Sequence, residues 1–373
     1  MGQHLNPAGA ADAASGTPVN LHDYEALAQA RLAASAWAYF AGGAGDEQTL
    51  ADNAAAWQRL RLLPRVARDL TGGHTRCTLG GRTLAAPLLL APVAFQRLAH
   101  ADGEAASALA AAAQGAGFVL SAQASQPLEA VARLVRDEAD RGPLWFQLYA
   151  QPEPGATLAL AQRARDAGFE ALVLTVDAPV HGARDRERRA GFQLPPGISA
   201  VNLGPTAAPP PGLSRFDLAA RHALPFSALA ELARHSGLPV WVKGVLHADD
   251  ARAAVAAGAA GVIVSNHGGR TLDTAVSTAQ ALPAIAQALA TLPGPRPGLL
   301  VDGGIRRGTD VLKALALGAD AVLLGRPQVM ALAAGGAYGV AHMLRLLRDE
   351  LEIAMILCGC RTLADIHPGL LTD

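Results

Sequence analysis

The stretch Val262 to Arg270 reads VIVSNHGGR and marks the point where a strand meets polar chemistry. Three consecutive β-branched apolar residues are typical of the end of a fully buried strand, and polar residues follow them directly. Two glycines then allow the backbone to turn sharply. His267 can accept a proton and Arg270 can bind a carboxylate, so the stretch predicts an acid/base and anion-binding pair. A histidine there can also be a structural residue bonded to a neighbouring loop, and the rest of the chain decides between these interpretations.

Outward from this stretch, short apolar segments alternate with alanine-rich helical segments. The eight predicted strands are 87–92, 117–121, 144–149, 171–176, 239–243, 261–264, 298–301 and 321–324. The predicted helices between and after them are 103–114, 126–136, 156–167, 227–234, 248–257, 278–292, 308–317 and 340–357. Because each buried strand must be covered by its crossover helix, this α/β pattern predicts a closed TIM (β/α)8 barrel. An open, doubly wound sheet is the alternative.

The N-terminal part and one long connection lie outside this alternation. Residues 21–34 and 36–40 have the apolar spacing of helices, with Asn20 as a cap of the first. We therefore predict a flexible tail at 1–20, a helical extension at 21–70 and a single domain over 21–373. The tail has neither a basic start nor an apolar core, which argues against a secretory signal or an anchor. The connection 177–226 far exceeds the ~15 residues of ordinary loops and predicts a lid loop after strand 4.

Composition narrows the class of protein. The chain is 51% hydrophobic but only 4% aromatic, which favours small aliphatic side chains packing helices on strands. With 31 basic and 32 acidic residues, it has no charge excess for binding nucleic acid or an anionic membrane. Cys77, Cys358 and Cys360 form neither a disulfide framework nor a zinc-ligand set. We therefore expect a cytoplasmic protein without a metal.

The candidate site follows from the fold, because the active site of a βα barrel lies at the carboxyl ends of its strands. The residues after the predicted strands are unusually polar: Pro92, Val93, Ala94, Ser121, Gln147, Tyr149, Thr175, Asp177, Arg184, Lys243, Ser265, His267, Arg270, Asp302, Gly303, Gly304, Arg306, Gly325 and Arg326. The glycines after strands seven and eight, together with two arginines, predict a phosphate-binding place.

A phosphate site alone also fits a sugar-phosphate isomerase or an aldolase. Lys243, at a buried strand end beside Ser121, Gln147 and Thr175, suits the heteroatom edge of a flat ring better than a small sugar. A cation beside the pyrimidine edge of a flavin would stabilise the anionic reduced ring. A Schiff-base lysine is the competing interpretation of Lys243.

Four motifs in the right order carry a resemblance to a known family. They are VKGV at 242–245, SNHGGR at 265–270, DGGIRRG at 302–308 and LGRP at 324–327. The chain, from about residue 24 to residue 360, closely resembles the FMN-dependent 2-hydroxy acid oxidases and dehydrogenases, which include glycolate oxidase, lactate oxidase and mandelate dehydrogenase. The resemblance implies FMN as the cofactor.

The resemblance also implies roles for the catalytic residues. His267 would be the base that removes the proton during oxidation at C2 of the substrate, and Asp177 would stabilise the resulting imidazolium. Arg270 and Arg184 would hold the substrate carboxylate. Tyr39 would add a hydroxyl to that carboxylate, and Tyr149 would contact the substrate hydroxyl or the developing oxyanion. The residues implied to bind FMN are Pro92, Val93, Ala94, Ser121, Gln147, Thr175, Lys243, Ser265, Asp302, Gly303, Gly304, Arg306, Gly325 and Arg326.

Some positions depart from the pattern of glycolate oxidase. Gln123 stands where glycolate oxidase-like members carry a tryptophan, so this substrate-lining position leaves room for a larger substrate than glycolate. The segment VAFQRL at 93–98 is more similar to that of aryl-hydroxyacid, mandelate-type oxidases, where Phe95 would line the pocket or simply pack. The lid loop lacks the apolar anchor of the membrane-bound members. Ala94 stands where oxidases tend to have alanine and several dehydrogenases have glycine, which favours oxygen as the acceptor.

The resulting prediction is an oxidase that converts an (S)-2-hydroxy acid to the 2-oxo acid, reduces FMN and passes the electrons to O2. Alternatives are a soluble dehydrogenase or a monooxygenase of the lactate or mandelate type, a non-redox phosphate-binding isomerase or aldolase, and a catalytically silent flavin-binding protein. The expected partners are the hydroxy acid and O2, without nucleic acid or membrane. A homotetramer is expected from the resemblance alone.

Overall fold

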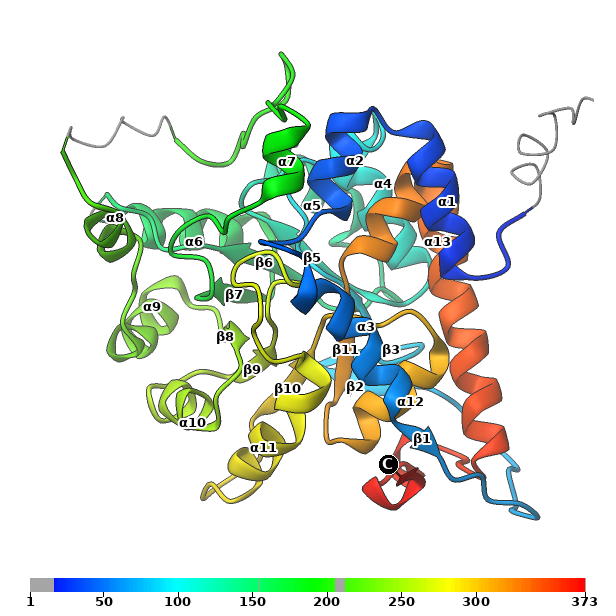
Figure 1. The fold of residues 1–373 in the computed structure, drawn as a ribbon. Helices are drawn as coiled ribbons and strands as arrows, with labels where there is room; N and C mark the ends of the chain where they lie inside the picture. Colours follow the sequence, from blue (N-terminus) through cyan, green and yellow to red (C-terminus); the bar gives the residue numbers. More distant parts are fainter. Residues whose placement is uncertain (1–16, 154, 205–211, 373) are drawn as a thin grey trace, which may run out of the picture.

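The fold is a closed barrel of eight parallel strands (Figure 1). The structure, a computed structural model, describes residues 17–153, 155–204 and 212–372. The barrel strands are β4 (Leu88–Leu90), β5 (Gly117–Ser121), β6 (Leu144–Leu148), β7 (Ala171–Thr175), β8 (Val240–Val245), β9 (Gly261–Val264), β10 (Gly298–Val301) and β11 (Ala321–Leu324). Neighbours in the barrel are neighbours in the chain, and β11 pairs with β4 to close the ring. The predicted (β/α)8 barrel is confirmed, and the open sheet is excluded.

Helices cover the outside of the barrel, as the alternation predicts. They are α4 (Gly103–Ala113), α5 (Leu128–Val135), α6 (Ala156–Ala167), α9 (Leu229–Ser236), α10 (Ala248–Ala256), α11 (Thr278–Ala290), α12 (Gly308–Ala316) and α13 (Arg326–Leu357). The prediction was wrong for the start of α13, which begins directly after β11 rather than at residue 340. It missed this because Gly335 and Gly336 interrupt the helical pattern, and both have non-helical backbone angles.

One helix of the described chain, α13, is long and apolar enough to cross a membrane by length and composition. However, 61% of its apolar window is buried inside the protein, where α13 packs against α1 (Leu21–Arg31), α4 and α12. Its apolar character therefore follows from its place in the core.

The amino-terminal end of the barrel is closed by a hairpin that the sequence did not predict. Strands β2 (Cys77–Leu79) and β3 (Arg82–Leu84) form this antiparallel pair. Leu79 and Leu84 join the apolar cluster inside the barrel, in which the rings of Trp145 and Trp241 lie 4.8 Å apart. The hairpin and the two indoles thus fill the lower half of the barrel, which leaves the carboxyl end of the strands for the site.

The N-terminal extension is helical only in its first part. Helices α1, α2 (Ala34–Ala41) and α3 (Gln48–Arg59) precede a short strand, β1 (Arg61–Leu62), which pairs with β12 (Leu371–Thr372) near the C-terminus. The prediction of helix as far as residue 70 was therefore wrong beyond residue 59. Asn20 caps α1 as predicted, its side chain accepting hydrogen bonds from two backbone amides. Residues 1–16 of the predicted tail lie outside the described residues.

The long connection after β7 contains structure of its own. It carries α7 (Asp185–Arg189) and α8 (Arg215–Arg221), separated by residues 205–211, which lie outside the described residues. Helix α7 packs against α2 above the barrel (Figure 1). Arg186 of α7 forms an ion pair with Glu47, and Phe192 stacks on Tyr39 of α2 with ring centroids 4.6 Å apart. The connection is thereby tied to the N-terminal helices over the barrel mouth.

Candidate active site

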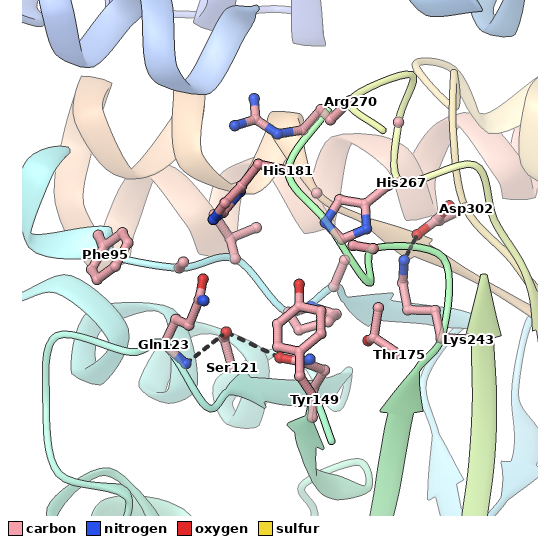
Figure 2. A pocket seen from close by; sticks show the side chains of 18 of the residues that line it. Phe95, Ser121, Gln123, Tyr149, Thr175, His181, Lys243, His267, Arg270 and Asp302 are labelled. Carbon is pink, nitrogen blue, oxygen red and sulfur yellow. Dashed lines mark hydrogen bonds and ion pairs between the residues drawn. The ribbon is translucent and has the colours of Figure 1, made fainter. Parts of the chain in front are cut away.

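A cavity of about 830 Å³ opens at the carboxyl ends of the barrel strands. Its walls come from the strand ends, from α2 and from the connection that carries α7. Figure 2 shows side chains from these separate parts of the chain pointing into one space. The chemistry of the molecule is concentrated here.

His267 and Asp177 form the acid/base pair of the cavity. The His267 Nδ1 atom lies 3.0 Å from Asp177 Oδ1. Because this contact uses Nδ1, the Nε2 atom of the ring is not bonded to Asp177. Burial alone would raise the pKa of Asp177, but the neighbouring His267 and Lys243 lower it below its ordinary value. Asp177 is therefore an ionised carboxylate at neutral pH.

The backbone at His267 is unusual for a residue with a side chain. Its φ is +56°, in the left-handed region, and the two glycines after it also have positive φ. The His267 amide donates to Ser265 Oγ at 3.1 Å, which closes the turn at the end of β9. Such strain at a strand end serves to aim the side chain, here into the cavity.

Lys243 supplies a buried positive charge from β8, the strand next to β9. Its ammonium lies 2.8 Å from Asp302 Oδ2 and donates to Ser265 Oγ at 2.7 Å. Burial would lower the pKa of Lys243, but the carboxylates of Asp302 and Asp177 raise it above the ordinary value. A Schiff-base nucleophile needs a lowered pKa, so the surroundings of Lys243 argue against that interpretation.

A short polar chain lines the floor beside Lys243. Ser121 Oγ donates to Gln147 Oε1 at 3.1 Å and accepts from the backbone amide of Gln123 (Figure 2). The other end of the Gln147 amide, Nε2, is buried and has no partner among the described residues, and the same holds for Asp302 Oδ1. Buried polar atoms are almost always paired, so these two point to a missing hydrogen-bonding group in the cavity.

Two arginines and a glutamate form an ion-pair cluster on the cavity wall. Glu187 Oε1 lies 3.0 Å from Arg270 Nη2 and 3.3 Å from Arg184 Nη1. Arg270 also donates to the backbone carbonyls of Tyr39 and Gly42, and its guanidinium lies 5.1 Å above the centre of the Tyr39 ring. Burial and the like charge of Arg184 lower the pKa of Arg270. Each arginine keeps donors for an anion, because the pair engages Glu187 through one nitrogen each.

Tyr39 and Tyr149 bring two phenol groups into the cavity, one from α2 and one after β6. Burial raises the pKa of both, and the carboxylate of Asp177 adds to the shift at Tyr149. Both hydroxyls therefore remain protonated donors at neutral pH.

The far end of the cavity has the features of an anion cradle. Gly303 and Gly304 have positive φ, and a Cβ at Gly304 would lie 2.2 Å from a backbone oxygen, so only glycine fits there. Gly325 precedes α13, and the first residues of this helix, Arg326 and Pro327, line the cavity. The Arg326 guanidinium, by contrast, donates to the carbonyls of Phe40, Gly42 and Gly268. Three donors of the Arg326 guanidinium are thus already bonded within the protein.

The structure brings the predicted site residues together around one cavity, with two exceptions. Asp177 and Ser265 do not line it. Asp177 lies behind His267, and Ser265 lies behind the wall, where its hydroxyl bonds both Lys243 and the His267 amide. Their positions indicate that they orient other side chains, and the contact of Ser265 with a cofactor stays a prediction. Whether the assigned roles are correct stays a prediction.

Several lining residues were not identified from the sequence. They come from the connection after β7 and are His181, Glu187, Phe192, Leu194, Leu203, His222 and Leu224. Only the spacing of Arg184 and Glu187, three residues apart, gave a signal for an ion pair on a helix. Phe95, for which lining and packing were both open, lines the cavity with a positive φ of +55°.

The arrangement can bind an anion on two arginines, accept a proton on an imidazole and hold a polar ring edge beside a lysine. Among the described residues, no group of three or more His, Cys, Asp or Glu side chains is placed to hold a metal ion. Acid/base and anion-binding chemistry thus come from the side chains themselves.

Comparison with known proteins gives a consistent result. A family model described as FMN-dependent dehydrogenase matches residues 28–373. An L-lactate oxidase of Roseobacter sp. (strain GAI101) is 48% identical over 363 residues, covering 96% of this chain and 95% of the relative. A 4-hydroxymandelate oxidase of Amycolatopsis orientalis is 44% identical, covering 93% and 96%. A crystal structure of mandelate oxidase with (S)-2-phenylpropionate superposes with a TM-score of 0.85 at 41% identity, covering 95% of this chain and 98% of that one.

Proposed function

The chain belongs to the FMN-dependent dehydrogenase family, and we propose that it oxidises an (S)-2-hydroxy acid to the 2-oxo acid and passes the electrons to O2, giving H2O2. One observation carries the proposal: the His267–Asp177 pair and the two arginines Arg184 and Arg270 meet on a single cavity. A 2-hydroxy acid presents a carboxylate next to the carbon that loses a proton, and these groups match both features.

The residues present fit FMN. The amide donor of Gln147, the acceptor Asp302 Oδ1 and the ammonium of Lys243 face the cavity, and the first two lack partners among the described residues. A flavin edge and a ribityl chain offer complementary groups, and the glycine cradle before α13 suits a phosphate. When bound, FMN supplies the two-electron acceptor that no amino-acid side chain provides.

The side chains of the protein do the remaining work. Arg184 and Arg270 bind the substrate carboxylate and fix its orientation, with the protonated hydroxyl of Tyr39 close by. His267 takes up the proton that is released during oxidation at C2, and Asp177 stabilises the imidazolium that forms. Tyr149 donates its hydroxyl to the oxygen on C2.

The family also contains enzymes that use other electron acceptors, so a dehydrogenase or a monooxygenase is the second candidate. Ala94, which lines the cavity, stands where oxidases of the family tend to carry alanine, and this supports O2 as the acceptor. The names of the relatives support lactate-sized and aryl substrates. Gln123 and Phe95 on the cavity wall leave a mixed polar and aromatic surface for the substrate side chain.

Anaerobic bleaching of the flavin absorbance tests the proposal. Purified protein should be yellow and should bleach with one or more of (S)-lactate, glycolate, (S)-2-hydroxyoctanoate and (S)-mandelate. Colour should return in air, with one H2O2 formed per substrate oxidised. A yellow protein that none of the four bleaches would refute the oxidation of 2-hydroxy acids. Bleaching without return of colour in air would instead support the dehydrogenase.

We also propose that the enzyme is cytoplasmic and forms a homotetramer. The three free cysteines suit a reducing compartment. Family resemblance supports the tetramer, and exposed apolar side chains on α13, at Tyr338, Ile353, Ile356 and Leu357, are compatible with a subunit contact. Light scattering coupled to size-exclusion chromatography measures the mass of the assembly, and a monomer at micromolar concentration would contradict the proposal.

A further inference from the structure

One part of the cavity wall is polar without serving the roles assigned so far. His181, from the connection after β7, and Gln123, after β5, both line the cavity. Figure 2 shows the Gln123 amide and the His181 ring pointing into the same part of the cavity, with Phe95 to one side. Lys243 and Asp302 lie on the other side, beyond His267. Of the flavin-binding groups, Ser121 adjoins Gln123, whereas Lys243 and Asp302 lie away from it.

Neither side chain is bonded within the described part of the chain, and solvent reaches both, because His181 is exposed and Gln123 is half-buried. The Gln123 backbone is bonded, its amide donating to Ser121 Oγ and its carbonyl accepting from Phe95, so the position of the residue is fixed. Its side-chain amide and the His181 ring make no hydrogen bond with any other described residue. An amide and an imidazole that face a cavity without partners are available to a ligand.

Charges from several elements surround His181. Arg184 and Glu187 face it from the same connection, and Arg270 and His267 face it from the turn after β9. Partial burial and the neighbouring arginines Arg184 and Arg270 lower the pKa of His181, whereas Glu187 raises it, and the net shift is downward. The ring is therefore neutral at pH 7 and offers one donor and one acceptor.

We propose that His181 and Gln123 form a polar subsite that recognises an uncharged hydrogen-bonding group, a hydroxyl or an amide, on the side chain of the 2-hydroxy acid substrate. This inference rests on the proposed function, because it assumes that Arg184 and Arg270 hold the substrate carboxylate. The side chain of a substrate held there extends toward the wall that carries the two residues, with the ring of Phe95 packing on its carbon atoms.

A second carboxylate fits the subsite less well than a neutral group. Glu187 forms ion pairs with both arginines, and Asp177 lies behind His267, so two carboxylates are already close to this part of the cavity. Arg184 and Arg270 are committed to Glu187 and to the first carboxylate of the substrate. A further anion would meet a neutral imidazole and a neutral amide, neither of which balances its charge.

A pair of substrates of equal size tests the subsite. (S)-2,4-dihydroxybutanoate carries a terminal hydroxyl where (S)-2-hydroxypentanoate carries a methyl group. We expect the holoenzyme to show a kcat/KM for the dihydroxy acid at least about tenfold higher, because the terminal hydroxyl can bond both polar side chains and the methyl group can bond neither. Equal values, or a preference for the methyl compound, would overturn the subsite. A higher kcat/KM for (S)-malate than for the dihydroxy acid would overturn its uncharged character.

Variants then assign the preference to the two residues. His181→Leu and Gln123→Leu should each lower the ratio of the two kcat/KM values about fivefold, the loss of one neutral hydrogen bond. His222→Leu is the matched control, because this second lining histidine already contacts the Ala150 carbonyl at 3.3 Å, and its ratio should not change. An unchanged ratio in both test variants would refute the assignment. Failure of the proposed function is distinguishable, since the flavin would then bleach with none of these acids.

Discussion

The two ends of the barrel differ in how they are packed: apolar side chains fill the amino-terminal end, and a polar cavity occupies the carboxyl end. At the amino-terminal end, Trp145 and Trp241 pack against each other within an apolar cluster that the β2–β3 hairpin closes. A Cβ at Gly298 would lie 2.1 Å from the Trp241 ring, so the packing there leaves no space. At the carboxyl end, a cavity of about 830 Å³ holds buried charges and buried polar atoms without partners among the described residues.

This difference indicates that the amino-terminal end stabilises the fold and that the carboxyl end carries the chemistry. Close apolar packing stabilises the fold, whereas unpaired buried polar atoms and a histidine with positive φ cost free energy in the absence of a ligand. Changes at the closed end should therefore lower the stability and spare the activity. Changes at the open end should lower the activity, and should lower the stability only where a buried charge loses its partner.

The largest effect is expected for His267→Asn. Asparagine tolerates the positive φ of this position, so the backbone is preserved while the proton acceptor is lost. The rate of anaerobic flavin reduction should fall about 10³-fold or more, with FMN retained and the Tm close to that of the wild type. Stopped-flow absorbance measures the rate. Reduction at more than a tenth of the wild-type rate would show that His267 is not the base.

Lys243→Met should lower both the stability and the activity, because Lys243 is a buried charge at the carboxyl end of the barrel. It removes the partner of Asp302, and breaking a buried ion pair costs about 3 kcal/mol of unfolding free energy. Flavin reduction at saturating substrate should also slow, because the positive charge at the ring edge is gone. Urea unfolding and stopped-flow reduction measure the two effects. An unfolding free energy and a reduction rate that both equal those of the wild type would contradict a buried Lys243 charge at the flavin edge.

Gly298→Ala tests the closed end. The added methyl group must displace the Trp241 ring, and we expect the unfolding free energy to fall by about 1–3 kcal/mol. The rate of flavin reduction in the folded protein should stay at the wild-type value. Gly204→Ala is the control, because among the described residues no atom beyond its chain neighbours lies within 4 Å of the new Cβ. A stable Gly298→Ala variant with impaired reduction would reverse the assignment of the two ends.

The smallest effect is expected for the ionisation of Tyr149. Burial raises its pKa in the folded protein above the ordinary value near 10. The folded state thus holds the phenol proton more tightly, and this contribution to stability is present below pH ~10 and is lost as the pH rises above it. Wild type should lose more unfolding free energy than Tyr149→Phe between pH ~9 and ~11. Equal losses in urea titrations would contradict a buried phenol.

Much of the fold was predictable because buried parallel strands are continuous apolar runs. Strands β5, β9, β10 and β11 have the predicted bounds. The missed elements are the hairpin β2–β3, the short pair β1 and β12, and the helices α7 and α8. The β1–β12 pair and α7 depend on contacts with distant parts of the chain, as Arg186 shows with Glu47, and local spacing carries little signal for such contacts.

The candidate site divides in the same way. Residues at strand ends, such as Lys243 and His267, were placed by the barrel rule alone. Glu187 and His181 were missed because the path of a long connection depends on what it packs against. The engagement of the Arg326 guanidinium by three carbonyls was missed as well, since those carbonyls come from α2, its C-cap and the turn after β9.

The sequence by itself determined the barrel, its order of strands and the set of polar residues at one end, because these follow from periodicity and from motifs that are local in the chain. Only the tertiary structure decided which of those residues face the cavity and which lie behind them. It also decided that the lid brings His181 opposite Gln123 and Glu187 between two arginines. Such relations join residues that are far apart in sequence, and packing sets them rather than any local pattern.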